Sequence, residues 1–430
     1  LPNMLAQLQF NEESILLGLD NSCYGIGTLG GGISFFDFDK DGWDDITVSS
    51  EEGEPVKFYN NINGYFSQID FGIVNELFET KTVQWIDFDN DNDYDLFITS
   101  NSDSNLLFEN LGNMVFNDIT ISSGLILNNN SNFGSSWGDY DKDGYLDVFI
   151  CSRGDFSNDT QNYLYHNNGD GTFTIVNDLV GIDNNHHLSF CSAFFDYNND
   201  GWQDLYIAND KLDTQNLLYK NNGDGTFTEV GEETGTNLSM DAMSTTIGDY
   251  NNDGWLDIYI TNTLAGNVFL KNNGDGTFRD ATADLGKIED QFTTSLAIAD
   301  INGDGLPDLF EAIYIEMNGA FELPKKDADG RELQPSPLKH YAQCDRWYEN
   351  LGDGRFQSRT ISREVAKPGT SLGLVVTDFN GNGQNEIFVG NDVRANHFLV
   401  QSGDDEFSNV ADIRGVANGF SGAANGCMGI

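Results

Sequence analysis

The chain repeats one short acidic pattern seven times. Its clearest copy runs from Asp139 to Asp147, with aspartate at positions 1, 3, 5 and 9 and glycine at position 6. The copies begin at residues 37, 87, 139, 196, 249, 300 and 378, so the intervals are 50, 52, 57, 53, 51 and 78 residues. A period near fifty residues, with one long interval, predicts a repeat protein in which each repeat is one structural unit.

Each copy predicts a loop that folds around a hard divalent cation. Ca²⁺ takes six to eight oxygen ligands, and glycine at position 6 supplies the positive φ that turns the chain back. An EF-hand would need a glutamate at position 12 and flanking helices. Here the strand-like run Val148-Phe149-Ile150 follows position 9 directly. The pattern therefore predicts a calcium loop between two strands, and about five to seven Ca²⁺ per chain.

The predicted ligands are the side chains at positions 1, 3, 5 and 9 and the backbone carbonyl at position 7. Repeats four, five and six have asparagine at position 3, and in repeat two Asn92 replaces the glycine, which asparagine tolerates. Repeat seven has two amides and a glutamate, which predicts weaker binding and leaves its occupancy open. In chain order the predicted ligands are Asp37, Asp39, Asp41, Trp43, Asp45, Asp87, Asp89, Asp91, Asp93, Asp95, Asp139, Asp141, Asp143, Tyr145, Asp147, Asp196, Asn198, Asp200, Trp202, Asp204, Asp249, Asn251, Asp253, Trp255, Asp257, Asp300, Asn302, Asp304, Leu306, Asp308, Asp378, Asn380, Asn382, Gln384 and Glu386.

Four strand-like segments recur in each repeat. In repeat three, strand a ends at Asp139, strand b follows the acidic loop, strand c covers residues 162–165, and strand d opens on Phe173. Strands c and d are separated by the turn Asn-Asn-Gly-Asp-Gly-Thr-Phe at 167–173, whose glycines suit a tight hairpin. No segment has a convincing helical period. Four short antiparallel strands per repeat predict an all-β fold, a β-propeller that forms a single domain over residues 1–430.

The two ends of the chain suggest one blade more than the seven complete repeats. Phe10 resembles the phenylalanine that opens strand d, and residues 421–430 resemble another strand a. If these strands pair, they form the two edges of an eighth blade. We therefore expect eight blades when the propeller closes, in a natural chain that continues beyond Ile430. Seven blades is the alternative.

The long interval in repeat six is an insertion at about residues 312–345, between strands b and c. In a four-stranded blade this connection lies on the edge opposite to the acidic loops, and long loops on a rigid scaffold commonly carry binding. The insertion is rich in basic residues although the whole chain is acidic. It predicts contact with a protein or an anionic polysaccharide. The candidate ligand-binding residues are Lys325, Lys326, Arg331, Lys339, His340 and Arg346.

The formal net charge of −48 excludes two classes of partner. A chain this acidic is repelled by nucleic acid and by anionic lipid. We find no apolar run of about eighteen residues, so no transmembrane segment is expected. Simple extracellular calcium loops bind at about 10⁻⁴–10⁻³ M, which suits a calcium-rich medium outside the cell. The five cysteines are scattered and odd in number, so they leave disulfide pairing open.

The acidic loops, the Asn-Asn-Gly-Asp-Gly-Thr-Phe turns and the Asp-Leu-Tyr-Ile strands together resemble the FG-GAP/VCBS repeat family, whose repeats also occur in integrin α-subunit propellers. The order of the elements is most similar to bacterial relatives of cartilage acidic protein. The resemblance covers nearly all of residues 8–430. It implies a calcium-loaded propeller that is secreted or held at the surface of a bacterial cell, and it implies no particular ligand.

Three functions are compatible with these features. We expect a calcium-stabilised extracellular binding or adhesion propeller that is not itself catalytic. One alternative is a structural subunit of a cell-surface assembly. The other is a polysaccharide lyase or hydrolase, for which Tyr341, His340, Arg346 and His397 supply candidate groups, although no motif fixes them together.

Overall fold

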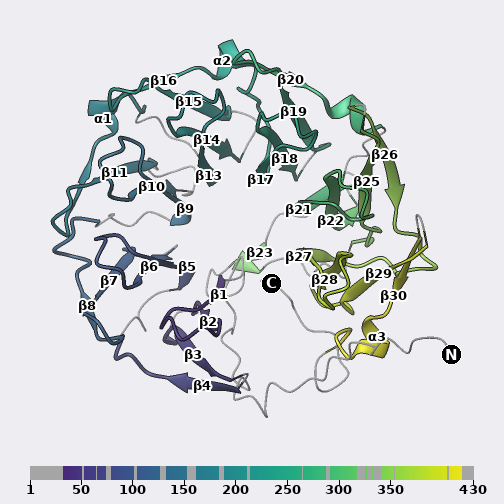
Figure 1. The fold of residues 1–430 in the computed structure, drawn as a ribbon, viewed down its shortest axis with the longest axis horizontal. Helices are drawn as coiled ribbons and strands as arrows, with labels where there is room; N and C mark the ends of the chain where they lie inside the picture. The colour runs from purple at the N-terminus through teal and green to yellow at the C-terminus, as the bar shows by residue number, and fades with distance from the viewer. Residues whose placement is uncertain are drawn as a thin grey trace. The chain divides into compact units, whose positions relative to one another are not determined.

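The seven acidic repeats each form a four-stranded antiparallel sheet. The structure, a computed structural model, describes residues 32–50, 53–63, 65–73, 79–100, 104–125, 132–152, 161–183, 188–210, 214–263, 265–286, 291–316, 325–326, 332–333, 340–352, 354–403 and 406–418. Within these residues each sheet takes its strands in chain order from one repeat. We number the sheets as blades 1 to 7 of a β-propeller fold (Figure 1).

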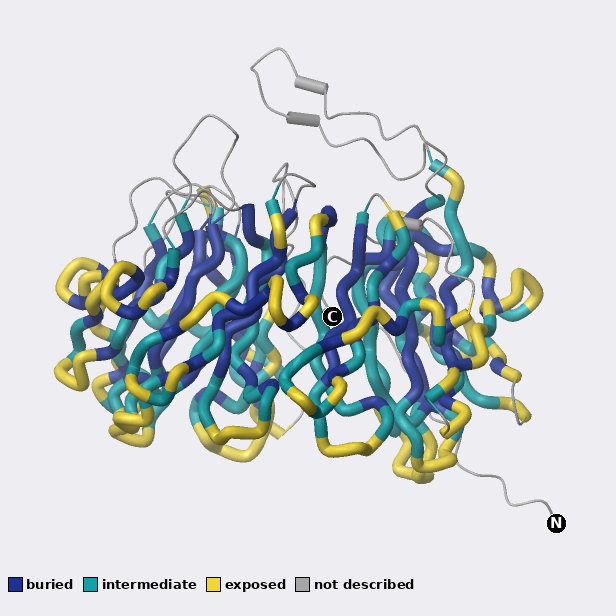
Figure 2. Tube along the Cα trace, turned by 90° about the horizontal axis from the view of Figure 1, so that it is seen from above, coloured by how far each residue is buried: buried dark blue, intermediate teal, exposed yellow. Residues whose placement is uncertain are grey.

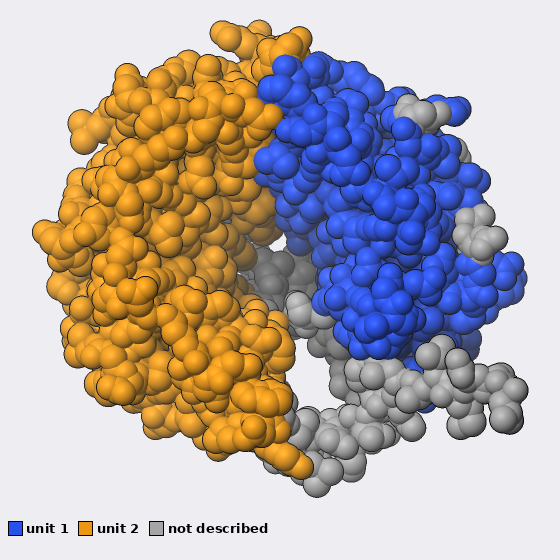
Figure 3. Space-filling view, viewed as in Figure 1, with its two compact units in different colours: residues 1–13, 243–274, 278–430 blue, residues 14–242, 275–277 orange. Residues whose placement is uncertain are grey.

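Blades 1 to 4 belong to one compact unit, residues 14–242 with 275–277, which is orange in Figure 3. In blade 3, Val148 of the second strand lies opposite Trp137 of the first and Tyr165 of the third. The strands of this unit are β1 (Ile33–Phe36), β2 (Asp45–Val48), β3 (Lys57–Ile62) and β4 (Tyr65–Ile69); β5 (Thr80–Ile86), β6 (Asp95–Ser100), β7 (Leu106–Asn110) and β8 (Phe116–Asp118); β9 (Asn132–Gly138), β10 (Asp147–Ser152), β11 (Tyr163–Asn167) and β12 (Phe173–Ile175); β13 (Ser189–Phe195), β14 (Asp204–Asn209), β15 (Leu217–Asn221) and β16 (Phe227–Glu229).

Blades 5 to 7 belong to a second compact unit, residues 1–13, 243–274 and 278–430, apart from a few residues of blade 5 (blue in Figure 3). Blade 6 contains the insertion, so its third strand follows its second only after a long connection. The strands are β17 (Ala242–Gly248), β18 (Asp257–Asn262), β19 (Val268–Asn272) and β20 (Phe278–Asp280); β21 (Gln291–Ala299), β22 (Asp308–Glu316), β25 (Arg346–Asn350) and β26 (Phe356–Thr360); β27 (Ser371–Thr377), β28 (Glu386–Asn391), β29 (His397–Gly403) and β30 (Glu406–Asn409).

The expectation of eight blades is wrong, and the alternative of seven is correct. From Ile33 to Asn409 every repeat supplies all four strands of its own blade, so the described residues hold as many blades as acidic loops. The eighth blade rested on Phe10 and residues 421–430, which lie outside the described residues. Two edge-like segments are a weak basis for a blade, because a sheet needs its inner strands to bury a core. The single domain and the continuation beyond Ile430 stay predictions.

In most blades the second strand is the most buried of the four strands. In β6, β10, β14 and β18 all six residues are buried, and each of these strands has three successive apolar residues after its first aspartate. Figure 2 shows buried strand segments in dark blue and exposed connecting turns in yellow.

Within a unit, neighbouring blades pack through aromatic side chains. The ring centroids of Phe97 and Trp137 lie 5.2 Å apart, and so do those of Tyr250 and Phe356. Inside each compact unit, apolar burial between neighbouring blades therefore helps to hold them together.

Four single helical turns follow the last strands of their blades and were not predicted. They are α1 (Asn177–Val180), α2 (Gly231–Thr234) and α3 (Ala411–Arg414), with the 3₁₀ turn η1 (Thr282–Leu285). The three α turns each end at a glycine in the left-handed conformation. Four residues are too few to display a helical period in a sequence, so the pattern could not reveal them.

The turn between the third and fourth strands packs against the acidic loop of the same blade. In blade 4 the Trp202 side chain, at position 7 of its loop, covers Gly223 so closely that a Cβ there would lie 2.9 Å from Trp202 Nε1. Tyr145 covers Gly169 in the same way in blade 3. The acidic loop and this turn therefore share one edge of the blade.

Replacing Gly223 with alanine should destabilise the protein more than replacing Gly225 in the same turn. Both glycines have positive φ, 76° and 83°, which costs an alanine about 1–2 kcal/mol. A Cβ on Gly225 would meet nothing within 4 Å, whereas one on Gly223 must displace Trp202 at a further cost of about 1–3 kcal/mol. Urea unfolding of Gly223→Ala and Gly225→Ala measures the two losses. Equal losses would contradict a tight Trp202 contact.

The insertion leaves blade 6 at the edge opposite to its acidic loop. β22 begins at Asp308, the last loop residue, and its nine residues carry the chain about 26 Å away from the loop. The structure then describes a short antiparallel pair, β23 (Lys325–Lys326) with β24 (Glu332–Leu333). The chain rejoins the blade at Arg346, which lies opposite Glu311. The insertion therefore begins after Glu316, a few residues later than expected.

Candidate metal centres

One hydrogen-bond frame recurs in the acidic loops, which we number with their blades. They are loop 1 (37–45), loop 2 (87–95), loop 3 (139–147), loop 4 (196–204), loop 5 (249–257), loop 6 (300–308) and loop 7 (378–386). In loop 1, Asp37 accepts the backbone N–H of Asp41 at 3.0 Å through Oδ1 and that of Gly42 at 2.9 Å through Oδ2. Asp41 Oδ1 in turn accepts the N–H of Trp43 at 2.9 Å. These bonds hold the acidic side chains in place on a rigid turn.

The carboxylate at position 9 is the buried anchor of the loop. In loop 3, Asp147 is fully buried and accepts the N–H of Tyr140 at 3.2 Å through Oδ2. Its Oδ1 accepts the N–H of Asn167, on the third strand of the blade, at 2.9 Å. Equivalent pairs of bonds recur in loops 1, 2, 4 and 6. One carboxylate thus joins the start of the loop to the third strand.

The carboxylates at positions 1, 3 and 9 converge in the first three loops. Oxygens of Asp37, Asp39 and Asp45 lie within 4.8 Å of one another, and so do those of the equivalent residues in loops 2 and 3. Two oxygens on opposite sides of one Ca²⁺ are about 4.6–5.2 Å apart, since each bond is about 2.3–2.6 Å. The spacing therefore fits ligands of a common calcium-sized ion.

The position-9 aspartates are buried among other acids, and this raises their pKa values. Burial is the main cause in each case, and neighbouring loop carboxylates add to it. The pKa is raised to about 6 for Asp45 and Asp308, to about 7 for Asp204 and Asp257, and to about 8 for Asp95 and Asp147. In these loops the effect of burial and of the neighbouring carboxylates outweighs that of any nearby positive group, and a divalent cation would supply the missing positive charge.

Loop 5 contains a buried carboxylate oxygen that is weakly paired. Asp257 is 2% exposed, and its Oδ1 accepts the N–H of Asn272 at 2.7 Å. The backbone N–H of Tyr250 interacts with the same carboxyl group and lowers its pKa, but Oδ2 makes no well-formed hydrogen bond with the described residues. A weakly paired buried carboxylate oxygen is costly in free energy, and an ion in the loop would satisfy it. This oxygen, together with a donor set of carboxylates, amides and carbonyls, fits a hard divalent cation.

Loop 7 is arranged differently at its predicted ligands. Asp378 keeps the frame and accepts the N–H groups of Asn382 at 3.0 Å and of Gly383 at 2.6 Å. However, the amide of Asn380 donates to Glu386 Oε1, so two of the predicted ligands are bonded to each other. This pairing is a second reason, besides the smaller charge, to expect weaker ion binding in loop 7.

Adjacent loops within a unit are linked by asparagines at the end of the third strand. Asn167 of blade 3 donates through Nδ2 to the carbonyl of Phe88 in loop 2 at 2.8 Å, and to that of Leu146 in its own loop at 3.1 Å. Asn221 and Asn350 donate in the same way to loops 3 and 5, each at 2.7 Å. We call these three residues the bridging asparagines. Each one contacts the loop of its own blade and that of the preceding blade.

The candidate ligand-binding residues of the insertion have different surroundings. Lys325 and Lys326 form β23, whereas Arg331 and Lys339 lie outside the described residues. His340 is half-buried at the end of the insertion. Arg346 is only 6% exposed, so most of its side chain lies inside blade 6.

A buried glutamate in blade 6 was missed by the sequence analysis. Glu311 is fully buried on β22 and accepts hydrogen bonds from Asn267 Nδ2 at 2.6 Å, from the Tyr348 hydroxyl at 3.1 Å and from the Tyr259 hydroxyl. Burial raises the pKa of Glu311, while these bonds and the charge of Arg346 lower it. Every other blade has valine or isoleucine at this strand position. A glutamate at a strand position that is otherwise aliphatic was the sequence feature that could have indicated this buried network.

Four overlapping stretches of the chain match the FG-GAP-like repeat, at residues 87–150, 139–207, 196–260 and 249–311. Each match begins at the first aspartate of a loop and ends in the second strand of the following blade. Together they cover just over half of the chain. The chain belongs to the FG-GAP-like repeat proteins. The family resemblance drawn from the loops and turns is thereby confirmed.

This FG-GAP-like repeat chain is also similar to cartilage acidic protein 1. The human protein is 25% identical over 218 residues, which cover 42% of this chain and 33% of the relative. The mouse protein is 25% identical with 42% and 34% covered, and that of Xenopus tropicalis is 25% identical with 38% and 31% covered. The FG-GAP-like chain therefore spans about a third of the length of these curated relatives.

Two solved structures are similar to the FG-GAP-like chain at low sequence identity. BBS1N, in complex with ARL6DN, has a TM-score of 0.47 and 9% identity, with 85% of this chain and 90% of that chain covered. YCF48 bound to D1 peptide has a TM-score of 0.42 and 8% identity, with 79% of this chain and 84% of that chain covered.

Among the described residues, no helix has the length and apolar character that crossing a bilayer requires.

Proposed function

We propose that this FG-GAP-like chain is a calcium-stabilised extracellular binding or adhesion module. The observation that carries the proposal is the recurring buried carboxylate at position 9, raised in pKa and surrounded by further loop oxygens. Loops 1 to 6 would each bind one Ca²⁺, and loop 7 would bind more weakly. Such weak oxygen-only loops fill at millimolar calcium, so the protein would act outside the cell, secreted or at a bacterial cell surface.

The proposed binding surface is the edge that bears the insertion. The acidic loops and the turns beside them would serve stability, because their side chains bond to one another and to the third strands. The opposite edge of blade 6 carries a long basic connection on a rigid β scaffold, an arrangement that commonly carries recognition. The partner would be a protein or a polysaccharide with anionic groups, attracted by Lys325, Lys326, Arg331 and Lys339.

A binding role is favoured over polysaccharide cleavage by the burial of two candidate catalytic groups. Arg346 is 6% exposed, and His397 is 5% exposed with its Nδ1 3.6 Å from Asp345 Oδ2. Both side chains therefore lie inside their blades, where a polysaccharide chain does not reach them. Tyr341 is 72% exposed and would be available for contact.

The binding proposal is tested by titrating the purified protein, at millimolar Ca²⁺, with two anionic polysaccharides, heparin and alginate, in a calorimeter. If the insertion makes the contact, Lys325→Ser/Lys326→Ser should weaken binding by about threefold to tenfold, as expected for the loss of two ion pairs with the polysaccharide. Raising the salt concentration should weaken binding of the unmodified protein as well.

The matched control removes the same charge elsewhere. Arg279 lies on the outer strand β20, and Arg355 lies in the turn at the acidic-loop edge of blade 6. Arg279→Ser/Arg355→Ser should leave polysaccharide affinity unchanged. Equal weakening by both double variants would mean that net charge, and not the insertion, governs binding.

A further inference from the structure

The acidic loops differ in the side chain at one position of the third strand. This position comes just before the asparagine whose backbone N–H bonds to the position-9 carboxylate. In several blades its side chain extends to the acidic loop. In blade 1 it is Asn60, whose amide donates to Asp39 Oδ2 at 2.5 Å. In blade 5 it is Lys271, whose Nζ lies 3.6 Å from Asp253 Oδ2. In blade 3 it is His166, which adds a nitrogen donor to a loop that otherwise offers only oxygen.

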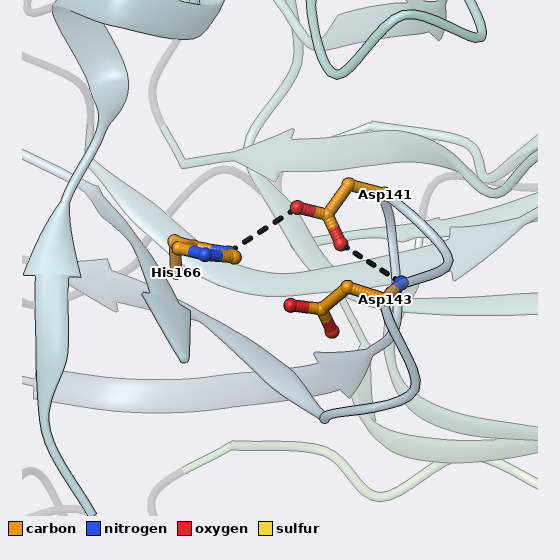
Figure 4. Close-up of side chains that lie close together, drawn as sticks. All are labelled: Asp141, Asp143 and His166. Atoms are coloured by element: carbon orange, nitrogen blue, oxygen red, sulfur yellow. Dashed lines mark hydrogen bonds and ion pairs between the residues drawn. The ribbon is translucent and has the colours of Figure 1, made fainter. Parts of the chain in front are cut away.

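His166 lies between two carboxylates of loop 3. Its Nδ1 is 3.3 Å from Asp141 Oδ2 and 3.1 Å from Asp147 Oδ1. Figure 4 shows the imidazole on its strand facing Asp141 on the loop, with Asp143 beside them. The three groups Asp141, Asp143 and His166 can place one ligand atom each within 4.8 Å of the others. Nδ1 hydrogen-bonds to Asp147 Oδ1 when it carries the proton, and it is free to bind a metal ion when it does not.

These separations are those of neighbouring ligands on one small cation. Bonds of about 2.0–2.2 Å at tetrahedral or octahedral angles place adjacent ligand atoms about 2.8–3.6 Å apart. The two measured distances, 3.1 and 3.3 Å, fall within this interval. Imidazole nitrogen is a good ligand for zinc-class transition ions, whereas Ca²⁺ takes oxygen ligands. The nitrogen therefore adds nothing to calcium binding and much to the binding of a transition ion.

We propose that loop 3 is a mixed nitrogen–oxygen site that takes a divalent transition ion of the zinc class in preference to Ca²⁺. His166 supplies the nitrogen, and Asp141, Asp143 and Asp147 supply the oxygens. The inference rests on the proposed role of the acidic loops as metal sites, and it assigns a different ion to one of them. The protein would then carry calcium in most loops and one transition ion in blade 3.

The test uses Co²⁺ as a coloured probe on tag-free protein that has been stripped of metal and reloaded with about 1 mM Ca²⁺, near the affinity of weak extracellular loops. The protein should bind one Co²⁺ that this calcium does not displace, seen as a ligand-field absorption band and counted by mass spectrometry. His166→Asn copies the residue of blade 1, and it should lower Co²⁺ affinity at loop 3 at least about tenfold. The calcium count should not fall.

Two further variants keep the proposal testable. His340→Asn removes a histidine outside the loops and should leave Co²⁺ binding unchanged. Asn60→His should give loop 1 the same donor set and add a second calcium-resistant Co²⁺. Equal Co²⁺ binding by the unmodified protein and His166→Asn would overturn the proposal, and the imidazole would then only hydrogen-bond to the carboxylates. In that case a normal calcium count would leave the proposed function standing, whereas an absence of both ions would remove it as well.

Discussion

Chelation of calcium with EGTA should lower the Tm of the protein by about eight degrees. At a free Ca²⁺ concentration tenfold above Kd, one site stabilises the fold by about 1.4 kcal/mol, so loops 1, 2, 4, 5 and 6 together contribute about 7 kcal/mol. A chain of this length has an unfolding entropy of about 0.9 kcal/mol per degree, which converts that free energy into the expected shift. Without the ions, the buried carboxylates would be left without a counter-charge. Differential scanning calorimetry measures the shift, and elemental analysis counts the calcium.

The control for chelation is EGTA that has been saturated with calcium before it is added. It should leave the Tm unchanged, because only removal of the ion is expected to matter. An unchanged Tm in free EGTA, together with protein that carries no calcium, would refute the calcium role of the loops. The aspartates would then have to be explained as acidic turns held only by their own hydrogen bonds.

The second large effect is expected at Glu311. Glu311→Ile gives blade 6 the aliphatic residue that the other blades have, yet it should lower the free energy of unfolding by about 3–5 kcal/mol. The reason is that the hydroxyls of Tyr259 and Tyr348 and the amide of Asn267 would lose their acceptor inside the core. Arg346, also buried, would lose the carboxylate that balances its charge. Urea unfolding at saturating calcium measures the loss.

Two variants separate the network from the glutamate itself. Glu311→Gln keeps an acceptor oxygen and should cost only about 1–2 kcal/mol. Glu316→Ile makes the same change at the end of the same strand, outside the network, and should shift stability by less than about 0.5 kcal/mol. If Glu311→Ile were as stable as the unmodified protein, the core of blade 6 would accept an aliphatic side chain as freely as the other blades do.

The acidic loops and strands could be predicted because their determinants are local. All the predicted ligands of one loop lie within nine residues, and each strand shows its burial in a few consecutive apolar positions. The number of blades depends instead on how distant segments meet, so Phe10 and residues 421–430 were a misleading guide to it. The network around Glu311 was out of reach for the same reason, since Asn267 comes from another blade 44 residues earlier.

His166 illustrates the same limit inside one of the predicted loops. Its loop was assigned from Asp139 to Asp147, but the imidazole comes from the third strand, 19 residues after Asp147. Only the register of β10 and β11 brings the two together. A nine-residue pattern therefore describes the acidic side chains of a loop and misses the imidazole that lies beside them in blade 3.

The bridging asparagines couple neighbouring loops of a unit, so these loops are not independent sites. Asn167 contacts its own loop and the loop of the preceding blade, so an ion bound in loop 3 would also order a group bonded to loop 2. Occupancy would then spread along the repeats as in a one-dimensional lattice, where each site responds to its nearest neighbours and little beyond them. Damage to one loop would remain local, and the array would lose its ions gradually instead of collapsing at a single concentration.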